Sequence, residues 1–365
     1  MTICYFGIYS SNYTRNKVNI MGLRENGVEV IECRSDESER FKKYLDLFWK
    51  YWPLRNKYDV MIVGFHGHAM MPLAWLCAKI ISRKKLIWDA FVSTYDTTVF
   101  DRKKARLGSV KATKHWLIDW LGCVLADLIL LDADAHGKYF IKTFHIRPAK
   151  FKTLPVGCDD TIMHPREQNP DGVASRPYGA GKETDNFLVH FHGTYIPAQG
   201  IPYIIEAAKL LEDMGVEFNI VGKLETYGKA IEFANELGAK NINFLDFMPY
   251  EKLAEYMAMA DICLGMFGIT DKAMRTGAFK LVEGLAMEKP VITAETPAMK
   301  EIFTNEENVL FCRPADGRDL AAKIMELKNN ENLRNRIAKN GYKLYKEKLT
   351  PRALGADLVN IISHA

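Results

Sequence analysis

The feature that most constrains the fold of this chain is a regular alternation of short strand-like runs with helical stretches. In the first half, runs rich in β-branched and aromatic residues cover 3–8, 28–33, 60–65, 86–90 and 128–132, and helical patterns separate them. Strands of this length joined through helices are typical of βαβ units, which build a parallel sheet. The first half is therefore predicted to be a doubly wound α/β domain.

The alternation stops at 157–186 and then starts again. This stretch contains Pro165, Pro170 and Pro177 and several glycines, as a linker would. Because 365 residues exceed what one core usually holds, two domains are expected. The predicted organisation is a Rossmann-like domain at 1–160, a linker at 161–186, a second Rossmann-like domain at 187–348 and a helix at 349–365 that packs back on the first domain. Two such domains are expected to hold ligands in a crevice at the carboxyl ends of their strands.

Charge is divided between the two halves. Residues 1–150 hold 24 Lys and Arg against 15 Asp and Glu, a balance of +9, whereas 151–365 hold 25 against 30, a balance of −5. Opposite signs indicate different partners for each half. A basic half suits anionic lipid headgroups, phosphorylated substrates or an ordinary solvated surface. The chain shows no nucleic-acid recognition module, so no nucleic-acid partner is expected.

The cysteines and the apolar runs indicate the compartment. The seven cysteines are dispersed and form no Cys-x-x-Cys pair, so a reducing, cytoplasmic location is expected. Residues 1–7 read as a strand rather than a signal peptide. The longest apolar run, 116–131, is interrupted by Asp119 and Asp127 and does not predict a membrane span.

Two segments of the first half are rich in basic residues, and one of them also carries several aromatic residues. Residues 41–52 join lysines to Phe, Tyr and Trp, and 102–114 add a second basic cluster. Such helices can lie on an anionic membrane surface, which would fit a lipid-linked acceptor at the inner membrane face. The alternative is a helix that packs its aromatic side chains on its own sheet. Both interpretations stay open at this point.

Four segments of the second half form an ordered set of motifs. They are FHGTYIPAQGI at 191–201, FNIVG at 218–222, NFLDFMPYEKL at 243–253 and FKLVEGLAMEKPVI at 279–292. In this order they resemble the retaining, nucleotide-sugar-dependent glycosyltransferases of family four, which have the GT-B architecture of two Rossmann-like domains facing a central cleft. The resemblance is close in the second half and loose in the first.

The resemblance implies a specific activity. A sugar would move from a UDP- or GDP-sugar to a glycan, lipid-linked or other hydroxyl acceptor, in polysaccharide, glycolipid or protein-glycan assembly. The nucleotide-diphosphate sugar would be a substrate, with no metal and no further cofactor. Two alternatives stay open: a nucleotide-sugar 2-epimerase of the same architecture, and a catalytically inactive sugar-nucleotide-binding partner.

The resemblance also implies a donor site. Glu283 matches the second glutamate of the family's Glu-x7-Glu signature, which binds the donor ribose hydroxyls. Phe247 and Met248 match the loop that holds the nucleobase, although Phe247 could equally pack in the core. Gly193 and Gly268 stand where glycine turns would present backbone N–H groups to the diphosphate.

Several positions depart from the family pattern. The first glutamate of the signature falls at Arg275, and the Arg and Lys that grip the diphosphate are replaced by Thr194 and Gln199. We therefore expect Arg275 and Lys280 to neutralise the phosphates, because guanidinium and ammonium groups both bind them. Thr194 stays assigned to donor binding.

In the first half the resemblance is carried by residues that follow strands. Gly7 occupies the first loop, which faces the donor phosphates, and Arg15 would reach a phosphate or solvent. His66 and His68 are expected to line the acceptor site. Asp89 stands where the family often has a histidine near the transferred sugar, and is assigned as a sugar-site and catalytic residue.

The remaining polar residues receive lesser roles. Tyr95 follows Asp89 and is placed on the acceptor side. Asp132 and Asp134 form an Asp-x-Asp triplet, but a chance match is common, and a structural or capping role is expected. His66 and His68 lack a third ligand at matching spacing, so no metal site is predicted.

Overall fold

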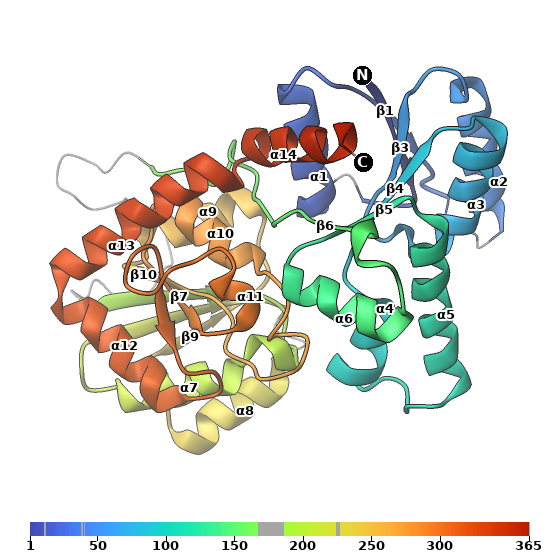
Figure 1. The fold of residues 1–365 in the computed structure, drawn as a ribbon. Helices are drawn as coiled ribbons and strands as arrows, with labels where there is room; N and C mark the ends of the chain where they lie inside the picture. Colours follow the sequence, from blue (N-terminus) through green and yellow to red (C-terminus); the bar gives the residue numbers. More distant parts are fainter. Residues whose placement is uncertain (11, 38, 40, 167–185, 224–226, 365) are drawn as a thin grey trace. The chain divides into compact units, whose positions relative to one another are not determined.

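The computed structural model describes residues 1–10, 12–37, 39, 41–166, 186–223 and 227–364, and these form two units of parallel α/β structure (Figure 1). Unit 1 comprises Met1–Asp159, Arg275–Gly277 and Leu349–Ala365, and unit 2 comprises Asp160–Met274 and Ala278–Lys348. The predicted fold class, two Rossmann-like doubly wound domains, is confirmed. Most of the predicted linker, 167–185, lies outside the described residues.

The sheet of unit 1 is entirely parallel, in the order β2-β1-β3-β4-β5-β6. The chain leaves β1 toward one edge and then returns to build the other, so the strand order reverses between β1 and β3. Ligands of such sheets bind at this switch point, outside the carboxyl ends of the strands. The strands are β1 (Thr2–Gly7), β2 (Glu29–Arg34), β3 (Val60–Val63), β4 (Lys85–Phe91), β5 (Leu128–Leu131) and β6 (Phe151–Thr153).

Helices cover both faces of this sheet. α1 and α14 share one core with it, and α2, α3, α5 and α6 share the other. The helices are α1 (Thr14–Glu25), α2 (Lys42–Tyr51), η1 (Trp52–Leu54), η2 (Gly67–Met70), α3 (Met71–Trp75), η3 (Leu76–Ile81), α4 (Thr94–Asp96), η4 (Thr97–Asp101), α5 (Val110–Leu125), α6 (Asp134–Phe144), η5 (Pro148–Lys150) and α14 (Pro351–Ser363).

The C-terminal helix α14 packs on α1 within unit 1 (Figure 1). The side chain of Thr350 caps α14 by accepting the N–H of Ala353 at 3.2 Å, and Pro351 begins the helix, where proline is favoured. Gly22 and Gly355 allow the two backbones to approach closely. A Cβ atom added at Gly22 would lie 2.1 Å from the carbonyl oxygen of Pro351.

The sheet of unit 2 is also parallel, in the order β12-β11-β10-β7-β8-β9. This is the strand order of the Rossmann fold, and its switch point lies between β7 and β10. The strands are β7 (Phe187–His192), β8 (Val216–Val221), β9 (Ile242–Leu245), β10 (Ile262–Leu264), β11 (Val291–Ala294) and β12 (Leu310–Cys312).

The helices of unit 2 complete the doubly wound layers. One core lies between the sheet and α7, α8 and α12, with α13 at its margin. The helices are η6 (Pro197–Gln199), α7 (Ile201–Leu210), α8 (Gly228–Leu237), α9 (Tyr250–Met259), α10 (Phe279–Ala286), α11 (Pro297–Lys300), α12 (Gly317–Asn329), α13 (Glu331–Leu344) and η8 (Tyr345–Leu349). In the described part of the chain, no helix combines the length and apolarity needed to cross a membrane.

Candidate donor-binding site

A cluster of buried polar side chains lies at the carboxyl end of β7, beside the switch point of unit 2. Its centre is Glu283 on α10, which is only 4% exposed. One carboxylate oxygen accepts the hydroxyl of Tyr250 at 2.6 Å, and the other lies 2.7 Å from Nε2 of His192, the last residue of β7. Three separate elements therefore position this carboxylate.

These neighbours keep Glu283 ionised. Burial alone would raise the pKa of its carboxyl group, but the hydrogen bonds from His192 and Tyr250 and the charge of Lys280 hold that pKa below its usual value. His192 is itself oriented by His190, whose Nε2 lies 3.1 Å from Nδ1 of His192. Burial lowers the pKa of His190 far below the usual range, so this second imidazole is neutral.

Lys280 lies one turn before Glu283 on α10 and is 6% exposed. Its ammonium group donates to the side-chain oxygen of Gln199 and lies 4.3 Å from the centre of the Phe191 ring. Burial lowers the pKa of Lys280 to about 7, against the opposing effect of the Glu283 charge. A buried ammonium poised between its two protonation states gains strongly from an anion that brings more negative charge.

The loop after β7 brings its backbone against this ammonium. Gly193 has a φ of 153°, and a Cβ atom there would lie 2.6 Å from Nζ of Lys280. The N–H of Gly193 donates to Val221 at 2.9 Å, and its carbonyl accepts the hydroxyl of Tyr227 at 2.6 Å. The glycine thus leaves room beside Lys280, but its N–H is already used and does not serve the diphosphate as expected.

Gly268 has a different structural role from the one expected. Its N–H donates to the carbonyl of Ala198 at 3.2 Å, and a Cβ atom there would lie 2.3 Å from the carbonyl oxygen of Pro197. The residue lets the loop after β10 pack on the loop after β7. Because its N–H is engaged, the expectation that it presents an amide to the phosphates is not supported.

The remaining expected donor residues lie on exposed loops of unit 2. Phe247 is 73% exposed, which rules out a core-packing role, and Met248 beside it is half-buried. An exposed aromatic ring after β9 is free to contact a flat nucleobase. Thr194 is exposed in the loop after β7.

Arg275 does not have the phosphate-binding geometry expected of it. The segment Arg275–Gly277 belongs to unit 1, and the guanidinium donates to Asp96 at 2.7 Å and stacks 3.9 Å from the centre of the Tyr139 ring. A buried carboxylate already neutralises its charge. Of the two cations that the sequence suggested for the phosphates, only Lys280 lies in unit 2, one turn from Glu283 on α10.

Asp89 and Arg15 form a buried ion pair. Nη2 of Arg15 lies 2.9 Å from Asp89, Asn19 donates to the same carboxylate at 2.9 Å, and Arg15 also donates to the carbonyl of Leu154. Asp89 is 0% exposed and Arg15 is 2% exposed. The expected catalytic role of Asp89 and phosphate contact of Arg15 are corrected to a structural role, because neither side chain reaches a surface.

The remaining predicted residues lie after β1, β3 and β4 of unit 1, with Gly7 expected on the donor side and His66, His68 and Tyr95 on the acceptor side. Gly7 ends β1 with a φ of 136°, and His66 is exposed with a φ of 78° in the loop after β3. His68 is buried and its Nε2 lies 2.8 Å from the carbonyl of Val92, so it holds the loop after β4. Tyr95 is half-buried, and its N–H donates to Asp119 at 2.9 Å.

The Asp-x-Asp triplet is structural in its geometry. Asp132 pairs with His136 at 2.8 Å and accepts the N–H of Gly277 at 2.7 Å, and Asp134 accepts the hydroxyl of Thr153. Among the residues that the structure describes, no group of three or more His, Cys, Asp or Glu side chains is arranged to hold a metal ion.

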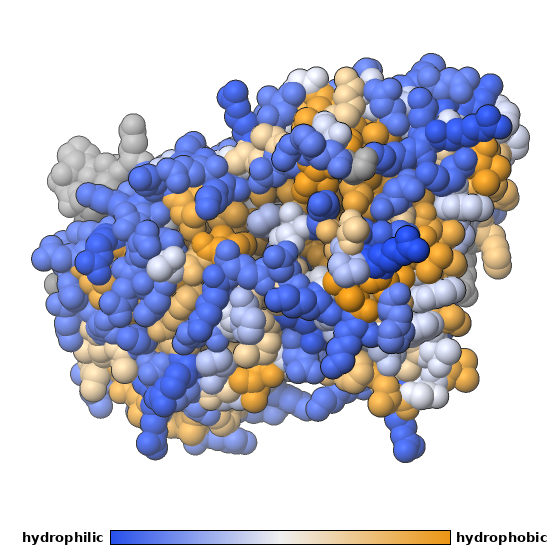
Figure 2. All heavy atoms as spheres, viewed as in Figure 1, coloured by the Kyte–Doolittle hydropathy of each residue, from blue (hydrophilic) through white to orange (hydrophobic). Residues whose placement is uncertain are grey.

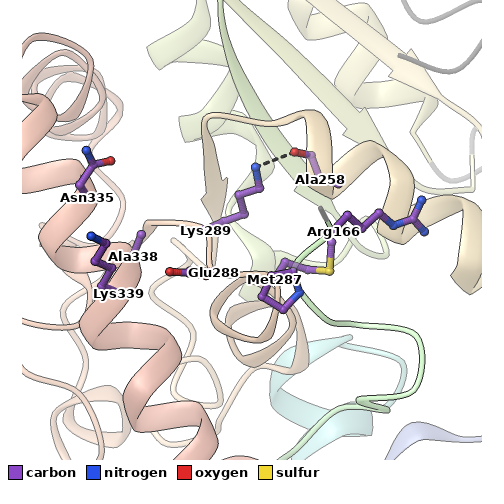
Figure 3. A pocket seen from close by; sticks show the side chains of 9 residues that line it. Arg166, Ala258, Met287, Glu288, Lys289, Asn335, Ala338 and Lys339 are labelled. Atoms are coloured by element: carbon purple, nitrogen blue, oxygen red, sulfur yellow. Dashed lines mark hydrogen bonds between the residues drawn. The ribbon is translucent and has the colours of Figure 1, made fainter. Parts of the chain in front are cut away.

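A pocket of about 350 Å³ in unit 2 lies away from this cluster (Figure 3). It is lined by Arg166, Met287, Lys289 and Lys339, among others, and Lys289 donates to the carbonyl of Ala258 at 2.6 Å. Lys289 lies two residues before the start of β11, so the pocket lies at the amino end of that strand. Because Lys289 serves the last turn of α9 and no expected donor residue lines the pocket, we assign it no role in catalysis.

Comparison with known proteins identifies the unit that carries the buried cluster. The family model described as "Glycosyl transferases group 1" matches residues 179–344. Residues 179–344 are therefore similar to the domain of the group 1 glycosyl transferases, and we refer to them as the group 1 domain. Glu283, Lys280, His192 and Tyr250 all lie within this domain.

Relatives of the group 1 domain extend over part of unit 1. An uncharacterized glycosyltransferase of Methanocaldococcus jannaschii is 28% identical over 228 residues, which are 61% of this chain and 62% of that protein. The match thus spans less than two thirds of the archaeal relative. The capsular polysaccharide biosynthesis glycosyltransferase CapM of Staphylococcus aureus is 23% identical over 74% of this chain and 70% of its own.

Solved structures share the whole fold. HepE of Anabaena in complex with UDP-glucose matches with a TM-score of 0.74 and 15% identity over 100% of both chains. Sucrose-phosphate synthase from Thermosynechococcus elongatus matches with a TM-score of 0.74 and 13% identity over 100% of this chain and 98% of its own. The chain therefore has the GT-B fold.

Proposed function

We propose that this chain transfers a sugar from a nucleotide-diphosphate sugar to a hydroxyl acceptor, with retention of the anomeric configuration. The observation that carries the proposal is the pairing of a buried, ionised Glu283 with a buried Lys280 on one face of α10, inside the group 1 domain. A carboxylate can accept hydrogen bonds from the two ribose hydroxyls of a nucleoside diphosphate, and an ammonium group can bind its phosphates.

Each group has a distinct task in the proposed site. Glu283 accepts hydrogen bonds from the ribose hydroxyls, held in place by Tyr250 and His192. Lys280 neutralises the diphosphate, and Phe247 contacts the nucleobase. We propose a uridine nucleotide as the first donor to test, because UDP and UDP-glucose are the ligands of the HepE structures, with a GDP-sugar as the other candidate.

We propose the transfer step that the family resemblance implies. The bond between the anomeric carbon and the diphosphate oxygen breaks, and its electron pair leaves with the diphosphate. The acceptor hydroxyl oxygen attacks the same face of the sugar and passes its proton to the departing phosphate oxygen. Lys280 stabilises the negative charge that grows on this leaving group, and such preorganised charge is usually the largest catalytic contribution.

The proposal also covers the need for a metal and the nature of the acceptor. Lys280 takes the electrostatic task that a metal would otherwise perform, so we propose turnover without an added metal. The acceptor is a glycan, lipid-linked or other hydroxyl compound, with His66 and Tyr95 of unit 1 as its proposed contacts, and Gly7 stays proposed for the donor side. CapM acts in capsular polysaccharide biosynthesis, as its name states, and a polysaccharide or glycolipid product is proposed here.

A donor panel tests the proposal. Melting curves are recorded with UDP, GDP and their sugars, followed by turnover with and without an acceptor mixture and with a chelator. We expect stabilisation by one nucleotide, acceptor-dependent release of nucleoside diphosphate and no loss with the chelator. Conversion of the donor sugar without any acceptor would instead indicate the epimerase, and binding without turnover over a broad acceptor panel would indicate the inactive binding partner.

A further inference from the structure

The helix α5 of unit 1 is apolar on two opposite sides, although one of them faces solvent. Its inner side packs on the core of unit 1 through Cys123, Trp116 and Trp120. Its outer side carries Val110, 89% exposed, and Leu117, 48% exposed. A soluble surface helix normally places polar residues on its outer face.

The outer apolar side chains of α5 form one stripe. Val110, Leu117 and Val124 follow one another at intervals of seven residues, which is two helical turns, and all three are exposed. Leu107, in the loop before the helix, is 63% exposed. A shallow hollow of about 450 Å³ runs along this side, lined by Gly108, Val110, Thr113, Lys114, Leu117, Ile118 and Leu121.

Neighbouring elements extend the apolar surface. Leu76 and Ile80 of the adjoining α3–η3 segment are 40% and 55% exposed, and α3 packs against α5. Figure 2 shows apolar side chains at the edge of unit 1 where Figure 1 places α3 and α5. On α2, in the same helical layer, Leu45 and Trp49 are 62% and 66% exposed, whereas Leu47 and Tyr51 are buried.

The exposed charges between residues 102 and 126 have one sign. Between residues 102 and 126 the only acidic side chain is Asp119, which is 0% exposed and accepts hydrogen bonds from Ser93 and Thr94. The exposed cations of this stretch are Arg102, Lys103, Lys104, Arg106, Lys111 and Lys114. A stretch rich in exposed cations beside exposed apolar side chains complements anionic headgroups above an apolar layer.

We infer that the α5 face, defined by Leu107, Val110, Lys111, Lys114, Leu117 and Val124, docks on the surface of an anionic lipid bilayer. The lysines contact lipid phosphates, and the apolar stripe enters the boundary between headgroups and acyl chains. The inference deepens the proposed function, since it favours a lipid-linked acceptor among the three acceptor classes. The docking itself requires neither donor nor turnover.

Sedimentation of the full chain with vesicles tests the inference without any nucleotide. Vesicles of phosphatidylcholine alone are compared with vesicles that also contain phosphatidylglycerol, at low and high salt. We expect binding to the anionic vesicles only, weakened by salt. The double variant Lys111→Gln/Lys114→Gln is expected to bind about 25-fold more weakly, at about fivefold per lysine.

Two further variants test whether the apolar stripe contributes to vesicle binding and whether the position of the lost charge matters. Val110→Asn/Leu117→Asn keeps every charge and is expected to weaken vesicle binding about tenfold. Lys339→Gln/Lys343→Gln removes the same charge from α13 of unit 2 and should bind as the parent protein does. Melting curves of all three variants show whether they fold.

Three results would overturn the inference. They are failure of the parent protein to bind anionic vesicles, equal binding of the Lys111→Gln/Lys114→Gln and parent proteins, and self-association through Val110 and Leu117 without vesicle binding. If the donor panel failed while vesicle binding behaved as expected, the proposed transfer would fall and the docking surface would remain.

Discussion

Raising the pH through the pKa of Lys280 should weaken donor binding. This ammonium is buried beside Glu283, and burial lowers its pKa from 10.5 to about 7. In the free protein the side chain is therefore half charged near neutral pH. A nucleotide sugar that needs the charged form must supply the free energy of protonation, and that cost grows as the pH rises.

The expected size follows from this pKa. The fall from 10.5 to about 7 means that the site disfavours the charged lysine by about 5 kcal/mol. The negative charge of a bound diphosphate offsets much of this cost of charging the buried lysine. Where the bound lysine stays protonated, affinity falls about tenfold for each pH unit above the free pKa. From about pH 6 to about pH 9 the loss is about a hundredfold.

Calorimetric titration with UDP-glucose measures this slope directly. The diphosphate of UDP-glucose is esterified at both ends and keeps its charge over this range, so its phosphates do not contribute a titration of their own. Lys280→Met removes the titrating group and should bind weakly with a flat pH profile. A parent protein whose affinity is independent of pH, or a Lys280→Met protein that keeps the slope, would refute the assignment of Lys280 to the diphosphate.

Lys280 should also make the stability of the protein depend on pH, in the opposite direction to donor affinity. Its folded-state pKa lies below its usual value, so the unfolded chain binds more protons between about pH 7 and about pH 10.5, and the free energy of unfolding rises with pH in that window. Lys280→Met should raise the melting temperature at neutral pH. A lower melting temperature for this variant would contradict the predicted cost of burying the charge.

Three substitutions test other parts of the account. Glu283→Gln should weaken UDP binding by about 10-fold or more in calorimetry, because hydrogen bonds to a charged group contribute about 1.5–3 kcal/mol; unchanged binding would remove the ribose from this position. Asp89→Asn leaves Arg15 charged and buried, which should cost about 3–5 kcal/mol in chemical denaturation. Turnover of its folded fraction should match the parent, and a stable but inactive Asp89→Asn protein would restore the catalytic role. Gly268→Ala places a methyl group 2.3 Å from a backbone carbonyl oxygen and should destabilise by about 1–3 kcal/mol, whereas Gly228→Ala has open space and should not; equal melting temperatures for the two would contradict the packing argument.

The fold could be predicted because its signal is local and repeated. Most strands are short runs rich in apolar residues, and the helices between them have their own periodicity, so the repeated alternations reinforce one another. The elements that were missed are weakly patterned. β6 has only three residues, Phe151–Thr153, and α6, Asp134–Phe144, begins with polar residues and contains Gly137.

Parts of the site were predictable for the same local reason. Lys280 and Glu283 lie one turn apart on a single helix, so their proximity follows from the sequence alone. The ion pairs of Arg275 and Asp89 did not follow, because their partners are 179 and 74 residues away in the chain. Sequence spacing carries no information about contacts at that separation.

The sequence analysis did not identify His192 and Tyr250 as hydrogen-bond partners of the Glu283 carboxylate. Both lie inside motifs that the sequence analysis quoted, but a histidine after a strand and a tyrosine at a helix start have many ordinary roles. The His-x-His pair at 190 and 192 ends β7, at the carboxyl edge of the sheet. Because this edge lies beside the switch point of unit 2, where ligands bind, the position of the pair could have indicated that His192 belongs to the site.

The central claim is that a nucleoside diphosphate binds at the carboxyl edge of the unit 2 sheet, with its ribose on Glu283 and its phosphates on Lys280. A crystal structure of the protein with UDP, or with GDP if the donor panel selects it, tests this claim most directly. The account predicts ribose hydroxyls hydrogen-bonded to Glu283 and a phosphate oxygen in place of Gln199 at the Lys280 ammonium. A nucleotide bound elsewhere, with the bonds of Lys280 to Gln199 and of Glu283 to His192 and Tyr250 unchanged and no ribose at the carboxylate, would contradict it.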